Sequence, residues 1–169
     1  MYRLILVITI LFALIFNVAA QEVNKKYLMS MLYIKSDEKL VHEIRGFFKK
    51  DIARKEFGVP FRISDRIIAT DLRPFKDDLE NGDEIMQSIL SRDFKPYSNT
   101  TLPDLLPMNQ SSLILYFSEP IDNYLVVELT DSSIEKTEGV RFGKGFKMLF
   151  LFDERGLIKN VYSKALIYN

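Results

Sequence analysis

Apolar residues at helical spacing make the segment from Asp37 to Phe57 the clearest element of the chain. The pattern consists of Leu40, Val41, Ile44, Phe47, Phe48 and Ile52. At about 100° per residue these side chains fall on one broad stripe, which predicts an amphipathic helix with one face in the core. Ser36 is the expected N-cap, and Gly58 followed by Pro60 is expected to end the helix.

Shorter apolar patterns lie on both sides of this helix. The run from Tyr27 to Ile34 fits a short strand or an earlier helix, because its periodicity does not decide between them. Isoleucines between Phe61 and Thr70 indicate a strand. A narrower apolar stripe predicts a second helix from Asp83 to Leu90, with a separate turn at Phe75 to Leu79.

A Pro-rich loop follows at residues 95–111, which include three prolines. Proline removes a backbone donor and fixes φ, so no regular structure longer than one turn is expected here. Loops of this length in compact domains are often functional or loosely ordered. The loop separates a helical part, at about residues 24–92, from a strand-rich part at residues 112–169.

The strand-rich part predicts an antiparallel sheet. Ser112 to Ser118 is a continuous apolar run, whereas Tyr124 to Thr130 alternates in strand fashion. Asp153-Glu154-Arg155-Gly156 is typical of a turn, and it predicts a hairpin between Phe146 to Phe152 and a last strand from Leu157 to Tyr168. Because Phe146 to Phe152 is apolar on both faces, we expect a central strand. Helices would cover one side, and the Pro-rich loop, the N-terminal segment or a ligand would cover the other.

Together these elements predict one α+β domain over residues 21–169. Its N-terminal helices are expected to pack on a roughly four-stranded antiparallel sheet formed mainly by the C-terminal half. A chain of this size buries roughly 68–70% of its unfolded surface, which is enough for a core of its own.

Residues 1–20 have the composition of a cleavable signal peptide. Arg3 is followed by an apolar run from Leu4 to Ile15, and small residues occupy the positions that an export peptidase reads before Gln21. A retained membrane anchor is the alternative, but it needs about 20 apolar residues, and this run is shorter and is interrupted by Asn17. The sequence therefore predicts an exported protein, periplasmic or extracellular, with no membrane span after cleavage.

Composition narrows the possible functions of the exported domain. The 23 basic and 23 acidic residues balance, and loss of Arg3 with the leader would leave a net charge near minus one. Such a chain has no field to attract nucleic acid or anionic membranes. The absence of cysteine excludes thiol nucleophiles, Cys-ligated zinc and disulfide bonds, so packing alone must stabilise the exported fold.

Candidate chemical motifs do not reach the patterns that their chemistry requires. His42, the sole histidine, lies about 150° from the centre of the apolar stripe and is interpreted as a surface residue rather than a catalytic base. The acidic stretch from Asp77 to Glu84 departs from a calcium loop at three positions. The glycines around Lys144 lack the spacing of a phosphate-binding loop. The sequence therefore predicts no catalytic, cofactor or metal site.

Two glycan acceptor sequences begin at Asn99 and Asn109 within the Pro-rich loop. They would carry glycans only in a eukaryotic secretory pathway. The sequence does not decide whether they are modified.

The favoured function is non-catalytic binding of a protein partner or a small apolar ligand, because 13 Phe and 8 Tyr outweigh the scarce catalytic residue types. This hypothesis predicts an apolar cavity between the helices and the sheet. A carboxylate-based hydrolase is one alternative, with Asp65, Asp71 and Asp153 as the acids nearest predicted strands and turns. A structural, envelope-associated protein is the other, with an exposed apolar patch or an unpaired sheet edge. Whether the protein is an enzyme stays open, with the balance against catalysis.

Overall fold

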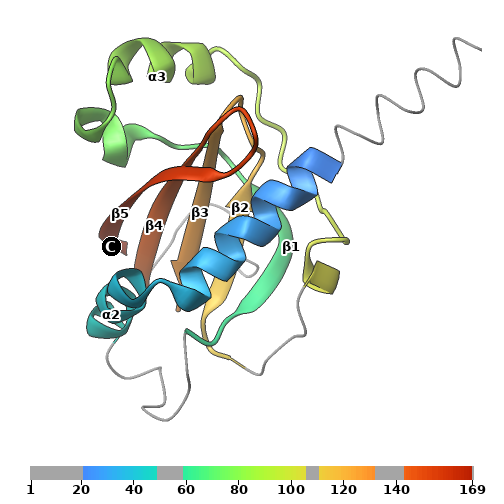
Figure 1. Cartoon of the computed structure of the whole chain (residues 1–169), viewed down its shortest axis with the longest axis vertical. Helices are drawn as coiled ribbons and strands as arrows, with labels where there is room; N and C mark the ends of the chain where they lie inside the picture. Colours follow the sequence, from blue (N-terminus) through green and yellow to red (C-terminus); the bar gives the residue numbers. More distant parts are fainter. Residues whose placement is uncertain (1–20, 49–58, 106–110, 132–142, 169) are drawn as a thin grey trace, which may run out of the picture.

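A five-stranded sheet forms the centre of the computed structural model, which describes residues 21–48, 59–105, 111–131 and 143–168 (Figure 1). The strands follow one another across the sheet in chain order. They are β1 (Arg62–Ile68), β2 (Ile114–Ser118), β3 (Tyr124–Thr130), β4 (Gly143–Phe152) and β5 (Ile158–Tyr168). The predicted α+β class is confirmed, and the predicted hairpin is the β4–β5 pair.

The sheet differs from the prediction in two ways. It has five strands rather than four, and it is mixed rather than antiparallel, because β1 pairs with β2 in parallel. The physical reason is the long connection between these two strands. It contains the 3₁₀ helix η1 (Arg73–Asp78), the helix α3 (Gly82–Leu90) and the Pro-rich segment, and a connection of such length can carry the chain back to the same end of the sheet.

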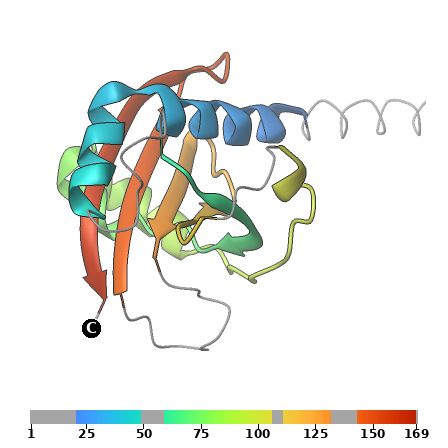
Figure 2. The same cartoon turned by 90° about the horizontal axis from the view of Figure 1, so that it is seen from below.

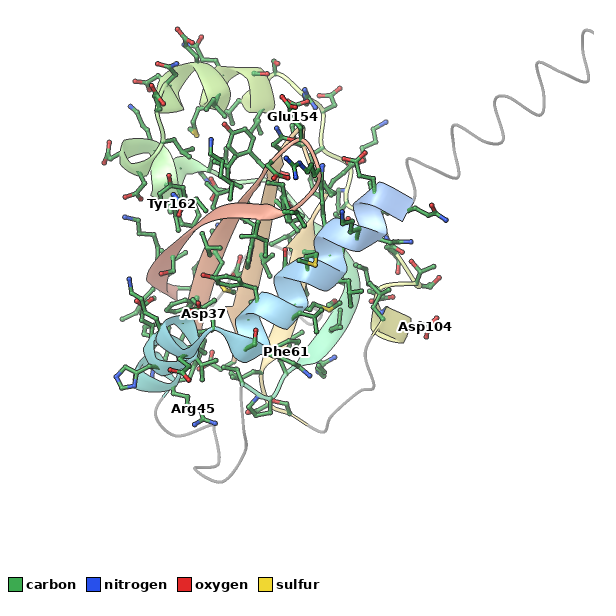
Figure 3. All side chains as sticks on the ribbon, in the orientation of Figure 1. Asp37, Arg45, Phe61, Asp104, Glu154 and Tyr162 are labelled. Carbon is green, nitrogen blue, oxygen red and sulfur yellow. The ribbon has the colours of Figure 1, made fainter. Side chains whose placement is uncertain are left out.

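The N-terminal part is helical through residues 21–36, which decides the open alternative at Tyr27 to Ile34 in favour of a helix. A second helix, α2 (Glu38–Phe47), follows directly. Its N-cap is Asp37 and not the predicted Ser36: the Asp37 carboxylate accepts a hydrogen bond from the Leu40 N–H at 2.8 Å. Ser36 still belongs to the preceding helix, and its hydroxyl donates to the Leu32 carbonyl. Figure 3 shows Asp37 at this junction.

The helix α2 also ends earlier than the predicted Phe57. Phe48 is its C-cap, and the Phe48 N–H donates to the Ile44 carbonyl. The predicted stripe is confirmed over this length, because Leu40, Ile44 and Phe48 are buried. Residues 49–58, with Ile52 and the predicted stop at Gly58, lie outside the described residues.

Helices cover both faces of the sheet (Figure 2). On the first face, residues 21–48 pack against a large apolar cluster that includes Phe117, Val127, Met148 and Phe150. On the second face, Leu72, Phe75 and Ile89 from the η1–α3 region pack on Val126 and Leu149. This confirms the turn and the second helix. The second face of β4 is therefore covered by the η1–α3 region, and not by the Pro-rich loop, the N-terminal segment or a ligand as expected. None of the helices in the described part of the chain is both long and apolar enough to span a bilayer.

Candidate functional site

A cleft of about 630 Å³ opens on the second face of the sheet, beside the edge strand β1. We call it the β1 cleft. Ile68 and Tyr116 come from the sheet, and Phe94, Pro96 and Tyr97 come from the segment after α3. Further lining residues are Asp65, Arg66, Ile67, Ala69 and Ser98. The volume lies in the range of about 300–1,000 Å³ that is typical of small-molecule sites.

Backbone pairing holds the wall of this cleft against the edge of β1. The Ile67 N–H donates to the Tyr97 carbonyl at 3.1 Å, and the Asn99 N–H donates to the Asp65 carbonyl at 2.6 Å. The Ser98 hydroxyl adds a 2.6 Å hydrogen bond to the Asp65 carboxylate. These bonds make residues 97–99 a short extension of the sheet, so this part of the Pro-rich loop is a fixed wall of the cleft.

The surface of the β1 cleft is mainly apolar. Ile68 and Tyr116, together with Ile114, form an apolar cluster of their own, separate from the two larger clusters. Phe94 and Tyr97 remain 38% and 44% exposed. Exposed aromatic rings above an apolar floor can stack on a ligand and remove its surface from water.

The Tyr97 hydroxyl of the cleft and the Tyr27 hydroxyl of the first-face cluster both have a raised pKa. Burial, and then the charge of Glu119, raise the pKa of the Tyr97 hydroxyl. Burial, followed by Tyr97 and Glu119, raises the pKa of Tyr27, whose hydroxyl donates to the Ser118 carbonyl. Both phenols are therefore neutral, and a neutral phenol is a hydrogen-bond donor rather than a nucleophile.

On the first face, the described helices and the sheet are packed against each other through apolar side chains. That interface is filled by the large apolar cluster of the first face. A cleft of about 320 Å³ does lie between α2 and β5, but polar side chains such as Asp37, Lys39 and Asn160 dominate its lining. In this cleft the Ser163 hydroxyl donates to the Glu43 carboxylate at 3.0 Å. The apolar cleft is on the opposite face.

The three acids considered for a hydrolase have separate partners. Partial burial would raise the pKa of Asp71, but hydrogen bonds from Arg73 and the charge of Lys147 outweigh it and lower that pKa to about 2. Backbone N–H groups of the β4–β5 turn lower the pKa of Asp153. Of the three acids, Asp65 alone lines the β1 cleft.

The structure also places the other residues that the sequence singled out. His42 is exposed, as predicted. Within the acidic stretch, Asp83 pairs with Lys76 and Asp78 pairs with Lys164. The described residues contain no group of three or more potential metal ligands. The Lys144 ammonium lies over the Phe47 ring, 5.6 Å from its centre.

Of the two glycan acceptor sites, Asn99 belongs to the segment paired with β1. Asn109 lies outside the described residues, as does Gly139, one of the glycines near Lys144.

Apart from Asp65, the residues of the β1 cleft were not identified from the sequence. One signal was present, because the aromatic residues Phe94 and Tyr97 lie on either side of Pro96 where the predicted Pro-rich loop begins. Comparison of the chain with protein-family models, with curated proteins and with solved structures gave no match. The geometry of the chain itself therefore carries the functional argument.

Proposed function

We propose that this protein is a non-catalytic binding domain that takes a small apolar ligand in the β1 cleft. The observation that carries the proposal is the cleft itself: about 630 Å³, with Ile68 and Tyr116 as an apolar floor and the exposed rings of Phe94 and Tyr97 as a wall. Export by the predicted leader is part of the proposal and would place this site outside the cytosol.

A small ligand fits these features better than a protein partner does. Protein interfaces usually bury roughly 800 Å² per partner over a broad surface, whereas this site is concave and its wall is fixed by backbone hydrogen bonds to β1. A preformed wall lowers the entropy cost of binding. Full burial of an aromatic side chain is worth roughly 1.5–3 kcal/mol, so completing the burial of Phe94 and Tyr97 would contribute about 1 kcal/mol each.

The proposal is tested by filling the cleft. Ala69 is exposed and lines the site, so Ala69→Trp would occupy ligand volume without removing a core contact. The matched control is Ala165→Trp, at another exposed alanine, on β5. Binding is followed with the uncharged dye N-phenyl-1-naphthylamine, whose fluorescence rises in apolar surroundings.

The dye is expected to bind the unmodified protein and the Ala165→Trp variant and not the Ala69→Trp variant. Native mass spectrometry of the naturally produced protein is expected to detect a small apolar molecule that is retained by the chain. Absence of dye binding by the unmodified protein, or equal binding by both variants, would contradict the proposal.

A further inference from the structure

A second cleft adjoins the β1 cleft. It has a volume of about 330 Å³, and we call it the α3 cleft. Ala69 and Phe94 line both clefts. The other apolar residues of the α3 cleft come from the end of α3 and from the turn after β2, and they are Ile89, Leu90, Pro120 and Ile121. Because the same two residues border both spaces, the clefts meet at Ala69 and Phe94.

The apolar surface is continuous along these two clefts. Leu90 is 70% exposed at the last position of α3, whereas its neighbour Ile89 is 9% exposed and packs in the core cluster of the second face. Leu90 therefore contributes little to the core but presents its side chain to the α3 cleft. Tyr97 presents a comparable exposed side chain to the β1 cleft. Apolar groups exposed along adjoining clefts are typical of a site for an extended apolar molecule.

Charges along the two clefts nearly cancel. The acids are Asp65, Asp93 and Glu119, and the bases are Arg66 and Arg92. Asp65 accepts a hydrogen bond from Ser98, and the Arg92 guanidinium lies 3.6 Å from the Asp122 carboxylate. Charges of opposite sign in nearly equal number produce no strong net field. An anionic headgroup therefore gains little here.

We propose that the β1 cleft and the α3 cleft form one groove for an elongated, uncharged hydrocarbon chain, such as that of a long-chain alcohol or ester. The chain crosses Ala69, with Phe94 beside it and Leu90 near one end. This inference rests on the proposed function and specifies the ligand class for the same site.

The length of the ligand provides the test. A series of n-alkanols from hexanol to dodecanol is used to displace N-phenyl-1-naphthylamine from the full chain. Each methylene group buried in the groove is expected to raise affinity about 4-fold. Leu90→Asp, with Leu90→Gln as a milder variant, is expected to weaken dodecanol binding by about 10-fold and to leave hexanol binding unchanged, because a charge at the α3 cleft opposes only the longer chain.

The matched control is Leu32→Asp, an exposed leucine of the helix over residues 21–36 on the other face of the sheet. This variant is expected to bind both alcohols as the unmodified protein does. Three results would refute the single-groove proposal. They are an affinity that does not depend on chain length, equal losses of affinity for both alcohols in Leu90→Asp, and dodecanoate binding about 10-fold more tightly than dodecanol. In each of these cases dye binding persists, so the proposed function survives. Failure of the dye to bind at all refutes both.

Discussion

An ion pair on the second face of the sheet allows a quantitative test of the fold. The Lys147 ammonium lies 3.1 Å from the Asp71 carboxylate, and their side chains are 7% and 25% exposed. Arg73 makes a further contact with Asp71 at 2.8 Å. We expect Asp71→Asn to destabilise the protein, because the substitution keeps the shape of the side chain but removes the carboxylate charge that pairs with the Lys147 ammonium at 3.1 Å.

The pKa of Asp71 gives the magnitude. In the fold this pKa is lowered from 3.8 to about 2, since hydrogen bonds from Arg73 and the charge of Lys147 outweigh the opposing effect of burial. At about 1.4 kcal/mol per pKa unit, the shift corresponds to roughly 2 kcal/mol of stability. Breaking a fully buried pair costs roughly 3–5 kcal/mol. Because Asp71 keeps some contact with water, we expect about 2–3 kcal/mol.

The loss of stability in Asp71→Asn should become smaller as the pH falls. A carboxyl group whose pKa is lower in the folded state stabilises the fold above its unfolded pKa, and this contribution disappears as the pH falls through the folded value. The difference in unfolding free energy between the unmodified protein and Asp71→Asn should therefore be largest at neutral pH. It should become smaller as the pH falls from 3.8 to about 2.

Urea denaturation followed by circular dichroism, from neutral pH to about pH 2, measures this difference. Asp83→Asn is the matched control, because Asp83 pairs with Lys76 on the surface, where both side chains are exposed. It is expected to change the denaturation midpoint little at any pH. A difference for Asp71→Asn that stays constant across the pH range, or that equals the control, would refute the reasoning.

Two further predictions concern the hairpin turn and the leader. Gly156 has φ of 70°, and an added Cβ would meet the Lys25 side chain only at 3.7 Å. Gly156→Ala should therefore cost about 1 kcal/mol through backbone strain alone, measured as a lower urea midpoint; an unchanged midpoint would contradict this. Intact-mass measurement of the naturally produced protein should find a chain that begins at Gln21, whereas a retained Met1 would end the export proposal.

Side-chain periodicity was sufficient to predict most of the regular elements. The stripe of α2 and the alternation along β3 arise because one side of each element is buried. At the Asp153 to Gly156 turn, the backbone of residue 156 has a positive φ, and glycine is favoured there because it has no Cβ. Each of these signals is local in the sequence, so one chain is enough to detect it.

The parallel pairing of β1 and the β1 cleft could not be predicted in the same way. Pairing direction depends on where a long connection returns, and no single residue determines this. The cleft combines Phe94 and Tyr97, from an irregular segment, with Ile68 and Tyr116, from strands. Every residue of β2 is buried, so its sequence does not distinguish the residue that faces a cleft from those that face the core.

The environment of Lys147 could be predicted only in part from the sequence. Lys147 occupies a strand that is apolar on both faces, directly opposite Glu128 of β3 in the register. A buried ammonium group requires an acceptor or an opposing charge, so the strand pattern alone indicates a partner. The sequence offers 23 acids and cannot select among them. The fold brings in Asp71 from just before η1, where its carboxylate also accepts the Arg73 N–H at 3.2 Å. A turn fixed by local hydrogen bonds therefore places the charge that a distant strand requires.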